Sequence, residues 1–438
     1  MLVSFDTLAR RGYLGKSDLD SRPLFPKNTV DFGAVIRWKL PLLKKAFEGF
    51  RNGATAADRD EFAAYCAEHA AWLDEFALFM SLKEQHDLIM WTKWSRELAL
   101  REPSAIERAK RELRDDIERH KFIQFEFERQ WRELKRYCGQ LGIRLMGDVP
   151  IYVALDSADV WANRELFKLN EEGQPTVVAG VPPDYFSATG QLWGNPIYRW
   201  EVHAQQGYSW WVTRFRRALE MLDMIRLDHF RGFAGFFEIP AGEETAVNGR
   251  WVQGPGAALF AVLEKELGSL PIVAENLGVI TPEVESLREQ FGFPGMAILQ
   301  FAFGKDPQAP DFKPHRYPHH KVAYTGTHDN DTVAGWWNST GASDSTRTSE
   351  DVAKEMEYAR RYLNTDGSEI HWVMIRKLME SVADTVLFPL QDVLGLGSEA
   401  RMNLPGTRSG NWRWRLQPEM LMPDIVHRLR ELAATYER

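Results

Sequence analysis

The chain has 438 residues, with 54 Lys and Arg against 62 Asp and Glu, so its formal net charge is −8. A hydrophobic content of 44% excludes a disordered chain, and the acidic balance leaves no basic footprint for nucleic acid. The sequence contains no apolar run of about 18 residues, the length needed to span a membrane, and no recognisable signal peptide. Its two cysteines are too few for a disulfide framework or a cysteine zinc site. We therefore expect a cytoplasmic protein.

The first third of the chain has the apolar spacing of helices. Such spacing occurs within residues 28–52, again from about Asp58, and once more through 72–79. Ser104 followed by Glu107 is a capping-box pattern, which predicts one long amphipathic helix that stops near Gly139. We therefore expect residues 1–139 to form a mostly helical insertion subdomain.

Short apolar runs alternate with helical stretches from residue 143 onward. Six runs are predicted strands, and most have the continuous hydrophobicity of strands buried on both faces: 144–152, 223–228, 271–275, 296–303, 322–327 and 385–390. Helices are expected between them, for example at 208–222, 256–268, 282–290 and 369–382. This alternation predicts βα units around a parallel sheet, so residues 140–438 are expected to form a (β/α) barrel.

Carboxylates occur where three of these runs end. Asp228, Glu275 and Asp329 close the second, third and fifth runs. In a (β/α) barrel the carboxyl ends of the strands form one rim, where active sites lie. Cleavage of a glycosidic bond needs an acid for the leaving oxygen and a carboxylate facing the oxocarbenium-like centre. Each residue taken alone could equally be a loop cap or an ion-pair partner.

Arg226 precedes Asp228 by two residues, so both side chains are expected on one face of the strand. A guanidinium there favours the ionised carboxylate that a nucleophile needs, and a structural ion pair is a compatible alternative. A metal site in the polar segment 328–331 is disfavoured, because no second group of ligands has metal-ligand spacing.

A stretch rich in Gly and Pro, residues 180–196, is predicted to be a loop. One interpretation is a loop pinned by its own hydrophobic residues. The other is a substrate loop, within a wider segment at about 156–205, in which Trp193 and Tyr185 face sugar rings while Gln191 and Asp184 bind hydroxyls.

Six ordered motifs cover essentially the whole chain: 147–152, 180–196, 226–232, 274–278, 326–331 and 387–392. This set resembles the 4-α-glucanotransferases, also called amylomaltases or disproportionating enzymes. The resemblance implies a (β/α)8 TIM barrel of the α-amylase clan with helical insertions. It also implies a retaining double displacement that moves α-1,4-glucan segments from a donor maltodextrin to the 4-hydroxyl of glucose or another maltodextrin, without cofactor or metal. The implied partners are maltodextrins and starch- or glycogen-derived glucans, with no nucleic acid and no membrane.

The resemblance also implies residue roles. Asp228 would be the nucleophile, Glu275 the general acid and then base, and Asp329 would bind sugar hydroxyls and favour ring distortion. Further implied substrate contacts are Asp148, Asp184, Gln191, Trp193, Arg226, His229, His328 and Asn411.

One departure from the family pattern concerns the start of the chain. Family members carry two barrel strands ahead of the position that Met1 resembles, so we expect six of eight strands and a truncated chain. The first and last strands found here would then be the edges that flank a gap. Two alternative functions are an α-glucan hydrolase and, because of the missing strands, an inactive glucan-binding fragment.

Overall fold

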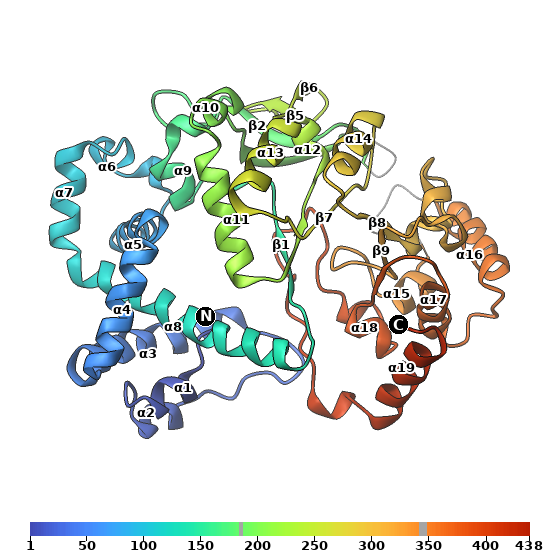
Figure 1. Ribbon diagram of the computed structural model, residues 1–438, viewed down its shortest axis with the longest axis horizontal. Coiled ribbons are helices and arrows are strands. Elements are labelled where there is room, and N and C mark those ends of the chain that lie inside the picture. Colours follow the sequence, from blue (N-terminus) through green and yellow to red (C-terminus); the bar gives the residue numbers. More distant parts are fainter. Residues whose placement is uncertain (184–186, 341–347) are drawn as a thin grey trace.

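The computed structural model describes residues 1–183, 187–340 and 348–438 (Figure 1). Asp184 and Tyr185, which were predicted to bind substrate, lie outside the described residues. Up to residue 140 the regular structure is helical: α1 (Phe5–Arg10), α2 (Lys16–Asp20), α3 (Phe32–Gly53), α4 (Ala56–Glu68), α5 (Ala70–Gln85), the 3-10 turn η1 (Trp91–Lys93), α6 (Arg96–Ala99), α7 (Pro103–Glu112) and α8 (Arg114–Gln140).

These helices bury a hydrophobic core of their own. Phe47 and Phe50 of α3 pack with Phe122 of α8, and Phe5 and Leu8 of α1 belong to the same cluster. The α3 helix begins after Asp31, whose carboxylate accepts the backbone N–H of Ala34. Amphipathic stripes and caps of this kind explain why the helical pattern could be recognised in the sequence.

The predicted long helix is wrong in one respect, because the structure has two helices there. Pro103 occupies the first turn of α7 and Glu102 precedes it without a side-chain capping bond, so Ser104 does not form the expected capping box. The first helix ends at Glu112, and Leu113 separates it from α8. Proline fits the first helical turn because its missing N–H would have no partner there.

Six parallel strands form the central sheet, as predicted. They are β1 (Met146–Val149), β4 (Met224–Leu227), β7 (Ile272–Ala274), β8 (Gly295–Ile298), β9 (Lys321–Tyr324) and β10 (Thr385–Leu387), hydrogen-bonded in chain order. The fourth predicted strand is too long, since Leu299–Ala302 forms the 3-10 turn η3. Among the described strands β1 and β10 are the two ends, which confirms the predicted edges and fits an incomplete (β/α)8 barrel.

Helices follow the strands as a (β/α) fold requires. The predicted helical stretches are α11 (Ser209–Met221), α13 (Ala257–Leu267), α14 (Pro282–Gln290) and α17 (Ile370–Met379). The remaining elements are α9 (Ala158–Ala162), η2 (Arg164–Leu166), α10 (Trp200–Gln205), α12 (Arg231–Ala234), η4 (Ala309–Phe312), η5 (Pro314–Arg316), α15 (Val333–Asn338), α16 (Ser349–Leu363), α18 (Leu390–Val393), η6 (Ser398–Ala400), η7 (Pro418–Met420) and α19 (Pro423–Thr435). None of the described helices is long and apolar enough to cross a membrane.

A second sheet corrects the prediction of a loop at 180–196. Its four antiparallel strands run in the order β3 (Gln191–Pro196), β2 (Val177–Val181), β5 (Gly235–Pro240) and β6 (Arg250–Gln253). The aromatic stretch is therefore the β2–β3 hairpin, and the wider segment at 156–205 also contains α9, η2 and α10. This hairpin stands beside the central sheet, because Asn195 Nδ2 donates to the carbonyl of Val153, four residues after β1.

Leu78, Phe79 and Trp91 of the helical region pack into the same core as the central strands. Two tethers are among the hydrogen bonds that also join this region to the rest of the molecule. Trp131 of α8 donates its indole N–H to the carbonyl of Met221 at the end of α11, at 2.7 Å. At the other tether Val30 N–H donates to Arg413 O at 2.7 Å, and Arg415 N–H donates to Asn28 O at 3.1 Å. The second tether links residues nearly 400 positions apart, close to Trp412 in the cleft described below.

Candidate active site

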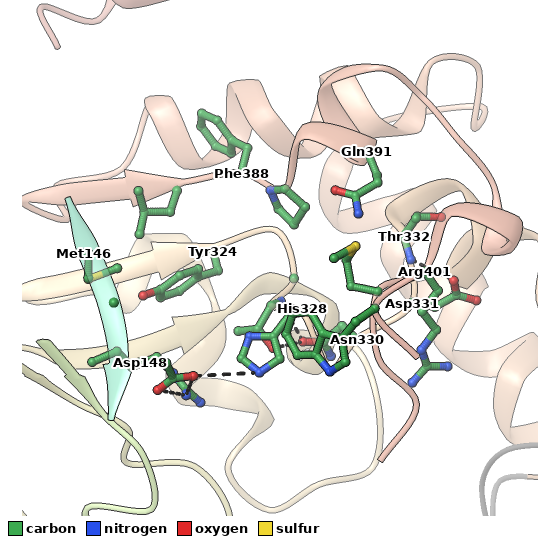
Figure 2. A pocket seen from close by; sticks show the side chains of 18 residues that line it. Met146, Asp148, Tyr324, His328, Asn330, Asp331, Thr332, Phe388, Gln391 and Arg401 are labelled. Atoms are coloured by element: carbon green, nitrogen blue, oxygen red, sulfur yellow. Dashed lines mark hydrogen bonds and ion pairs between the residues drawn. The ribbon is translucent and has the colours of Figure 1, made fainter. Parts of the chain in front are cut away.

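A cavity of about 450 Å³ opens at the carboxyl ends of the central strands (Figure 2). Met146 of β1 lines one side, Leu387 of β10 lines the other, and Tyr324 of β9 contributes its ring. Asp148 and His328 supply polar groups to the same space. The cavity therefore lies between the two end strands of the sheet and at the rim where the sequence predicted a site.

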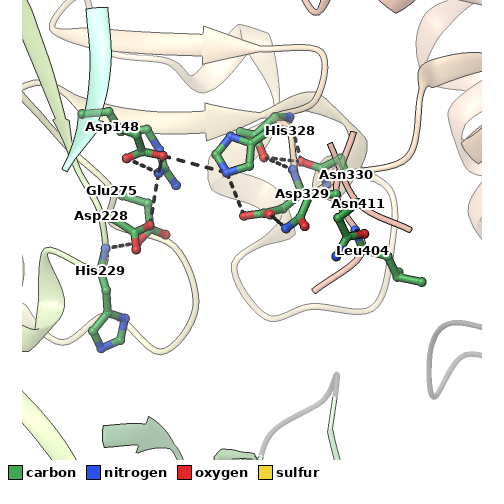
Figure 3. Close-up of polar contacts among 12 residues, drawn as sticks. Asp148, Asp228, His229, Glu275, His328, Asp329, Asn330, Leu404 and Asn411 are labelled. Atoms are coloured by element: carbon green, nitrogen blue, oxygen red, sulfur yellow. Dashed lines mark hydrogen bonds and ion pairs between the residues drawn. The ribbon is translucent and has the colours of Figure 1, made fainter. Parts of the chain in front are cut away.

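Arg226 holds two carboxylates through one guanidinium nitrogen. Its Nη1 donates to both oxygens of Asp148, at 2.7 and 2.6 Å, and to Oδ1 of Asp228 at 3.1 Å (Figure 3). Asp148 and Arg226 are paired in register on β1 and β4, and Asp228 follows two residues after Arg226 on the same face. The predicted ion pair is confirmed, and Asp148 is a second partner that the sequence did not indicate for it.

The pKa of Asp228 is raised above the ordinary value of an aspartate. Desolvation in the cleft is the largest cause, and the negative charges of Asp148 and Asp329 add to it. Arg226 acts in the opposite direction by attraction and by its hydrogen bond. The guanidinium favours the ionised form as predicted, but it offsets the desolvation only in part.

Glu275 is buried directly after β7 and has a pKa raised to about 7. Burial is the largest cause, and the neighbouring Asp228 contributes in the same direction while Arg226 opposes it. Its carboxylate accepts two backbone N–H groups, from His229 at 2.7 Å and Leu277 at 3.2 Å. A carboxyl with this pKa can hold a proton and also release it near neutral pH.

His229 adopts the left-handed backbone conformation, with φ of 48°. Only a few per cent of non-glycine residues do so, and such strain is found at sites where the surrounding structure requires it. Here the conformation accompanies the N–H that His229 donates to Glu275. Burial lowers the pKa of the ring to about 4, so the imidazole is neutral, and it packs edge-on against Trp193 with 4.8 Å between ring centroids.

His328 and Asp329 lie on the segment that follows β9. His328 Nε2 is 3.4 Å from Asp329 Oδ2 and 3.9 Å from Asp148 Oδ2, so the imidazole connects this segment to the Arg226 cluster. Its ring packs against that of Trp412 in a tilted arrangement, with 5.2 Å between centroids. Polar contacts thus run from Asp228 through Arg226, Asp148 and His328 to Asp329, and Glu275 is bonded to the backbone N–H of His229, which directly follows Asp228 (Figure 3).

Two residues at this site were missed in the sequence. Asn403 donates its amide N–H to Asp329 Oδ1 at 2.6 Å and its backbone N–H to His328 O at 3.0 Å. Arg401 donates to the backbone carbonyl of Asp329 at 2.8 Å. Neither residue follows a predicted strand, so a search of strand ends could not find them.

The other predicted contacts are less centrally placed. Trp193 and Gln191 lie on β3, where the indole N–H donates to the Gln191 amide oxygen at 3.1 Å. Asn411 uses its side chain within its own turn, accepting from Leu404 N–H at 3.0 Å and donating to Thr407 Oγ1 at 3.0 Å. It braces the turn that precedes Trp412, and the structure shows no contact between it and the carboxylates.

A metal-binding arrangement is not found within residues 1–183, 187–340 and 348–438. No group of three or more His, Cys, Asp and Glu side chains there is placed to hold an ion. The polar segment 328–331 makes hydrogen bonds instead. Asn330 Oδ1, for example, accepts the backbone N–H of Thr327 at 2.8 Å.

The sequence pattern that defines the 4-alpha-glucanotransferases matches residues 1–421. The chain belongs to this family. It is 49% identical to the 4-alpha-glucanotransferase of Thermus thermophilus and 48% identical to that of Synechocystis sp.. Both matches cover 100% of this chain and, respectively, 86% and 85% of the relative.

Solved structures of family members agree with this assignment. The amylomaltase of Streptococcus agalactiae, determined in complex with acarbose, matches with a TM-score of 0.92 and 36% identity, over 100% of this chain and 86% of that one. The amylomaltase of Corynebacterium glutamicum matches with a TM-score of 0.76 over 98% of this chain and 62% of that one. At 18% identity the second match concerns the fold alone.

Proposed function

We propose that the chain transfers α-1,4-glucan segments from a donor maltodextrin to the 4-hydroxyl of glucose or of another maltodextrin. Membership of the 4-alpha-glucanotransferase family supports this reaction. The observation that carries the mechanism is the contrast between Asp228, held by Arg226, and the buried Glu275, whose pKa is about 7. Retaining glycosyl transfer requires one carboxyl group that gives and takes a proton and a second that attacks the anomeric carbon as a carboxylate.

In the first step Glu275 is protonated and gives its proton to the glycosidic oxygen as the bond to the anomeric carbon breaks. Asp228 attacks that carbon and forms a covalent glycosyl-enzyme, and the reducing-end portion of the donor leaves with the proton. Arg226 keeps the Asp228 carboxylate available for this attack. Glu275, now ionised, remains in place through the backbone N–H groups of His229 and Leu277.

In the second step the 4-hydroxyl of the acceptor sugar attacks the same carbon. Glu275 takes the hydroxyl proton, the bond to Asp228 breaks, and the new glycosidic bond has the configuration of the old one. Asp329 binds sugar hydroxyls and favours the distorted ring, with His328 beside it. Asn403 orients the Asp329 carboxylate for this contact.

The remaining predicted contacts are proposed to bind the glucan on either side of the cleaved bond. Trp193 offers a ring face and Gln191 an amide from the β2–β3 hairpin, and Asp148 binds a sugar beside Arg226. Asp184, His229 and Asn411 are also proposed to contact the bound glucan.

We also keep the predicted organisation and location as proposals. Residues 1–139 form a helical insertion subdomain on the barrel rim, and residues 140–438 form the catalytic barrel. The cytoplasm is the proposed compartment, which is compatible with two unpaired cysteines, Cys66 and Cys138.

Incubation of the purified protein with maltotriose tests the function. Transfer produces glucose together with maltodextrins both longer and shorter than the donor. Shortening alone would indicate an α-glucan hydrolase. Absence of any product from a protein that unfolds cooperatively would contradict both enzymatic functions and favour a glucan-binding fragment.

A further inference from the structure

A fully buried carboxylate, Asp392, joins the two ends of the segment that carries His328 and Asp329. Asp392 lies on α18, just beyond β10, and its side chain is 0% exposed. Thr325 Oγ1 donates to its Oδ2 at 2.6 Å, and the backbone N–H of Val333 donates to its Oδ1 at 2.7 Å. Thr325 directly follows β9 and Val333 begins α15, so these two bonds fix where the segment leaves the sheet and where it re-enters a helix.

Further bonds, both from neighbouring elements and within the segment, hold the backbone between these two ends. Gln300 Nε2 donates to the backbone carbonyl of Asp331 at 2.8 Å, and Ser398 Oγ donates to Oδ2 of the Asp331 side chain at 2.6 Å. Asn330 accepts from Thr327. A displacement at either end would therefore reach Asp329, which lies between them, four residues from each end.

The donors that face Asp392 are neutral, and the charge that acts on it is that of another acid, Asp331. Burial raises the pKa of Asp392 to about 6, in keeping with a carboxylate that has no cationic partner among the contacts found. A buried carboxylate costs free energy, but it accepts stronger hydrogen bonds than a neutral group does. Removing it would leave the Thr325 hydroxyl and the Val333 N–H buried without an acceptor.

We propose that Asp392 is a positioning residue for the transfer reaction, which holds the 325–333 segment so that Asp329 meets the sugar in the transition state. This inference rests on the role proposed above for Asp329. It assigns Asp392 no contact with substrate. An error in placing Asp329 should lower kcat more than it changes KM, because the lost contacts belong mainly to the transition state.

The first test compares Asp392→Leu with Asp392→Asn in maltotriose transfer. We expect Asp392→Leu to lower kcat by about 100-fold with little change in KM, as for a displaced catalytic group. The amide side chain introduced by Asp392→Asn can still accept the Val333 N–H through its oxygen and donate to Thr325 Oγ1, so kcat should fall by only about fivefold.

Glu238→Gln is the matched control. Glu238 is a buried carboxylate on β5 in the other sheet, and the kcat of this variant should equal that of the parent. If Asp392→Leu does not fold, Thr325→Val takes its place, since it removes one of the two bonds.

The second test is a double-mutant cycle with Asp329→Asn. If Asp392 acts through Asp329, the Asp392→Asn and Thr325→Val substitutions should lower kcat far less in the Asp329→Asn background than in the parent. Additive effects, or a rise in KM in place of a fall in kcat, would overturn this inference while leaving the proposed function intact. Full activity of Asp329→Asn alone would instead overturn the role proposed for Asp329, and this inference with it.

Discussion

Glu275 and Asp228 are both carboxylic acids that follow neighbouring strands, but their different surroundings give them different acid–base behaviour. The Asp228 side chain is partly exposed and has a guanidinium at 3.1 Å. Glu275 is buried, and its hydrogen bonds come from uncharged backbone N–H groups. Burial therefore dominates at Glu275 and raises its pKa to about 7, which suits a group that must first donate a proton and later accept one.

The pH dependence of transfer follows from this contrast. Donor cleavage needs Glu275 protonated, so kcat/KM should fall as the pH rises through about 7. It should also fall at acidic pH as Asp228 becomes protonated, at a pKa above the ordinary aspartate value. Glu275→Gln should lower kcat/KM by roughly 10²–10⁴-fold and remove the alkaline limb. Rates measured from pH 4 to 9 check this, with the exposed Glu283→Gln on α14 as control. An alkaline limb that persists in the Glu275→Gln variant would contradict the assignment.

The same residue should make stability depend on pH. The native pKa of about 7 exceeds the ordinary value of 4.5, so the folded protein retains a proton that the unfolded chain has released. Stability therefore falls as the pH rises between these two values, and the whole cost is present above pH 7. Because glutamine never ionises, Glu275→Gln should raise Tm relative to the parent by about 2 °C or more at pH 8, and by less at pH 5. Calorimetry at both pH values measures this, and Glu283→Gln should show no such gain.

Asn403 shows what local sequence reasoning could not supply at the residue scale. Asp228, Glu275 and Asp329 could be selected because each closes an apolar run, and parallel strands bring their ends together. Asn403 lies in an irregular segment 74 residues from its partner Asp329. Nothing in its neighbours along the chain signals that contact, which depends on how the segment folds back over the cleft.

At the scale of elements, the two sheets differed in how well the sequence revealed them. The four inner parallel strands, β4, β7, β8 and β9, are mostly buried, so their apolar runs could be recognised. The antiparallel strand β3 is largely exposed, contains Gly194 in the left-handed conformation and ends at Pro196, all of which are typical of a loop. It is a strand because it pairs with β2, which in turn pairs with β5 about 60 residues away. Such long-range pairing leaves no periodic signal within the strand itself.

The β2–β3 hairpin should influence whether water competes with the sugar acceptor. Trp193 packs against His229, whose backbone N–H binds Glu275, and exclusion of water favours transfer over hydrolysis. We expect Trp193→Ala to raise the ratio of hydrolysis to transfer roughly threefold, and Trp193→Phe to keep it near the parent value. Leu192→Ala, one position along the same strand and thus on its other face, is the control. Product ratios from maltotriose measure the effect, and an unchanged ratio in Trp193→Ala would remove the hairpin from this role.

At the scale of the whole molecule, the tether between residues 28–30 and 413–415 connects the helical region to the cleft. It ends one residue from Trp412, whose ring supports His328. These two backbone hydrogen bonds link the helical region to the active site, in addition to the core that α5 and α7 share with the central sheet.

Val30→Pro tests this connection because proline removes the N–H that donates to Arg413 O. We expect the KM for maltotriose to rise roughly fivefold as Trp412 loses support, with a smaller change in kcat. Thr29→Pro is the matched control, since the Thr29 N–H makes no hydrogen bond to another described residue. Equal effects of the two substitutions would show that general loosening, and not the lost bond, changes KM.

The charges around the cleft have a consequence for the kinds of polysaccharide that can enter. Asp148, Asp228 and Asp329, together with the titratable Glu275, outnumber the guanidinium groups of Arg226 and Arg401 among the described residues of this site, so the local field is negative. Such a field attracts cationic groups and repels anions. A sugar that carries a protonated amine would be drawn toward the carboxylates, whereas a phosphate ester on a starch or glycogen branch would be repelled. Phosphorylation of storage polysaccharide would thus mark points beyond which this enzyme does not trim or rebuild the chain.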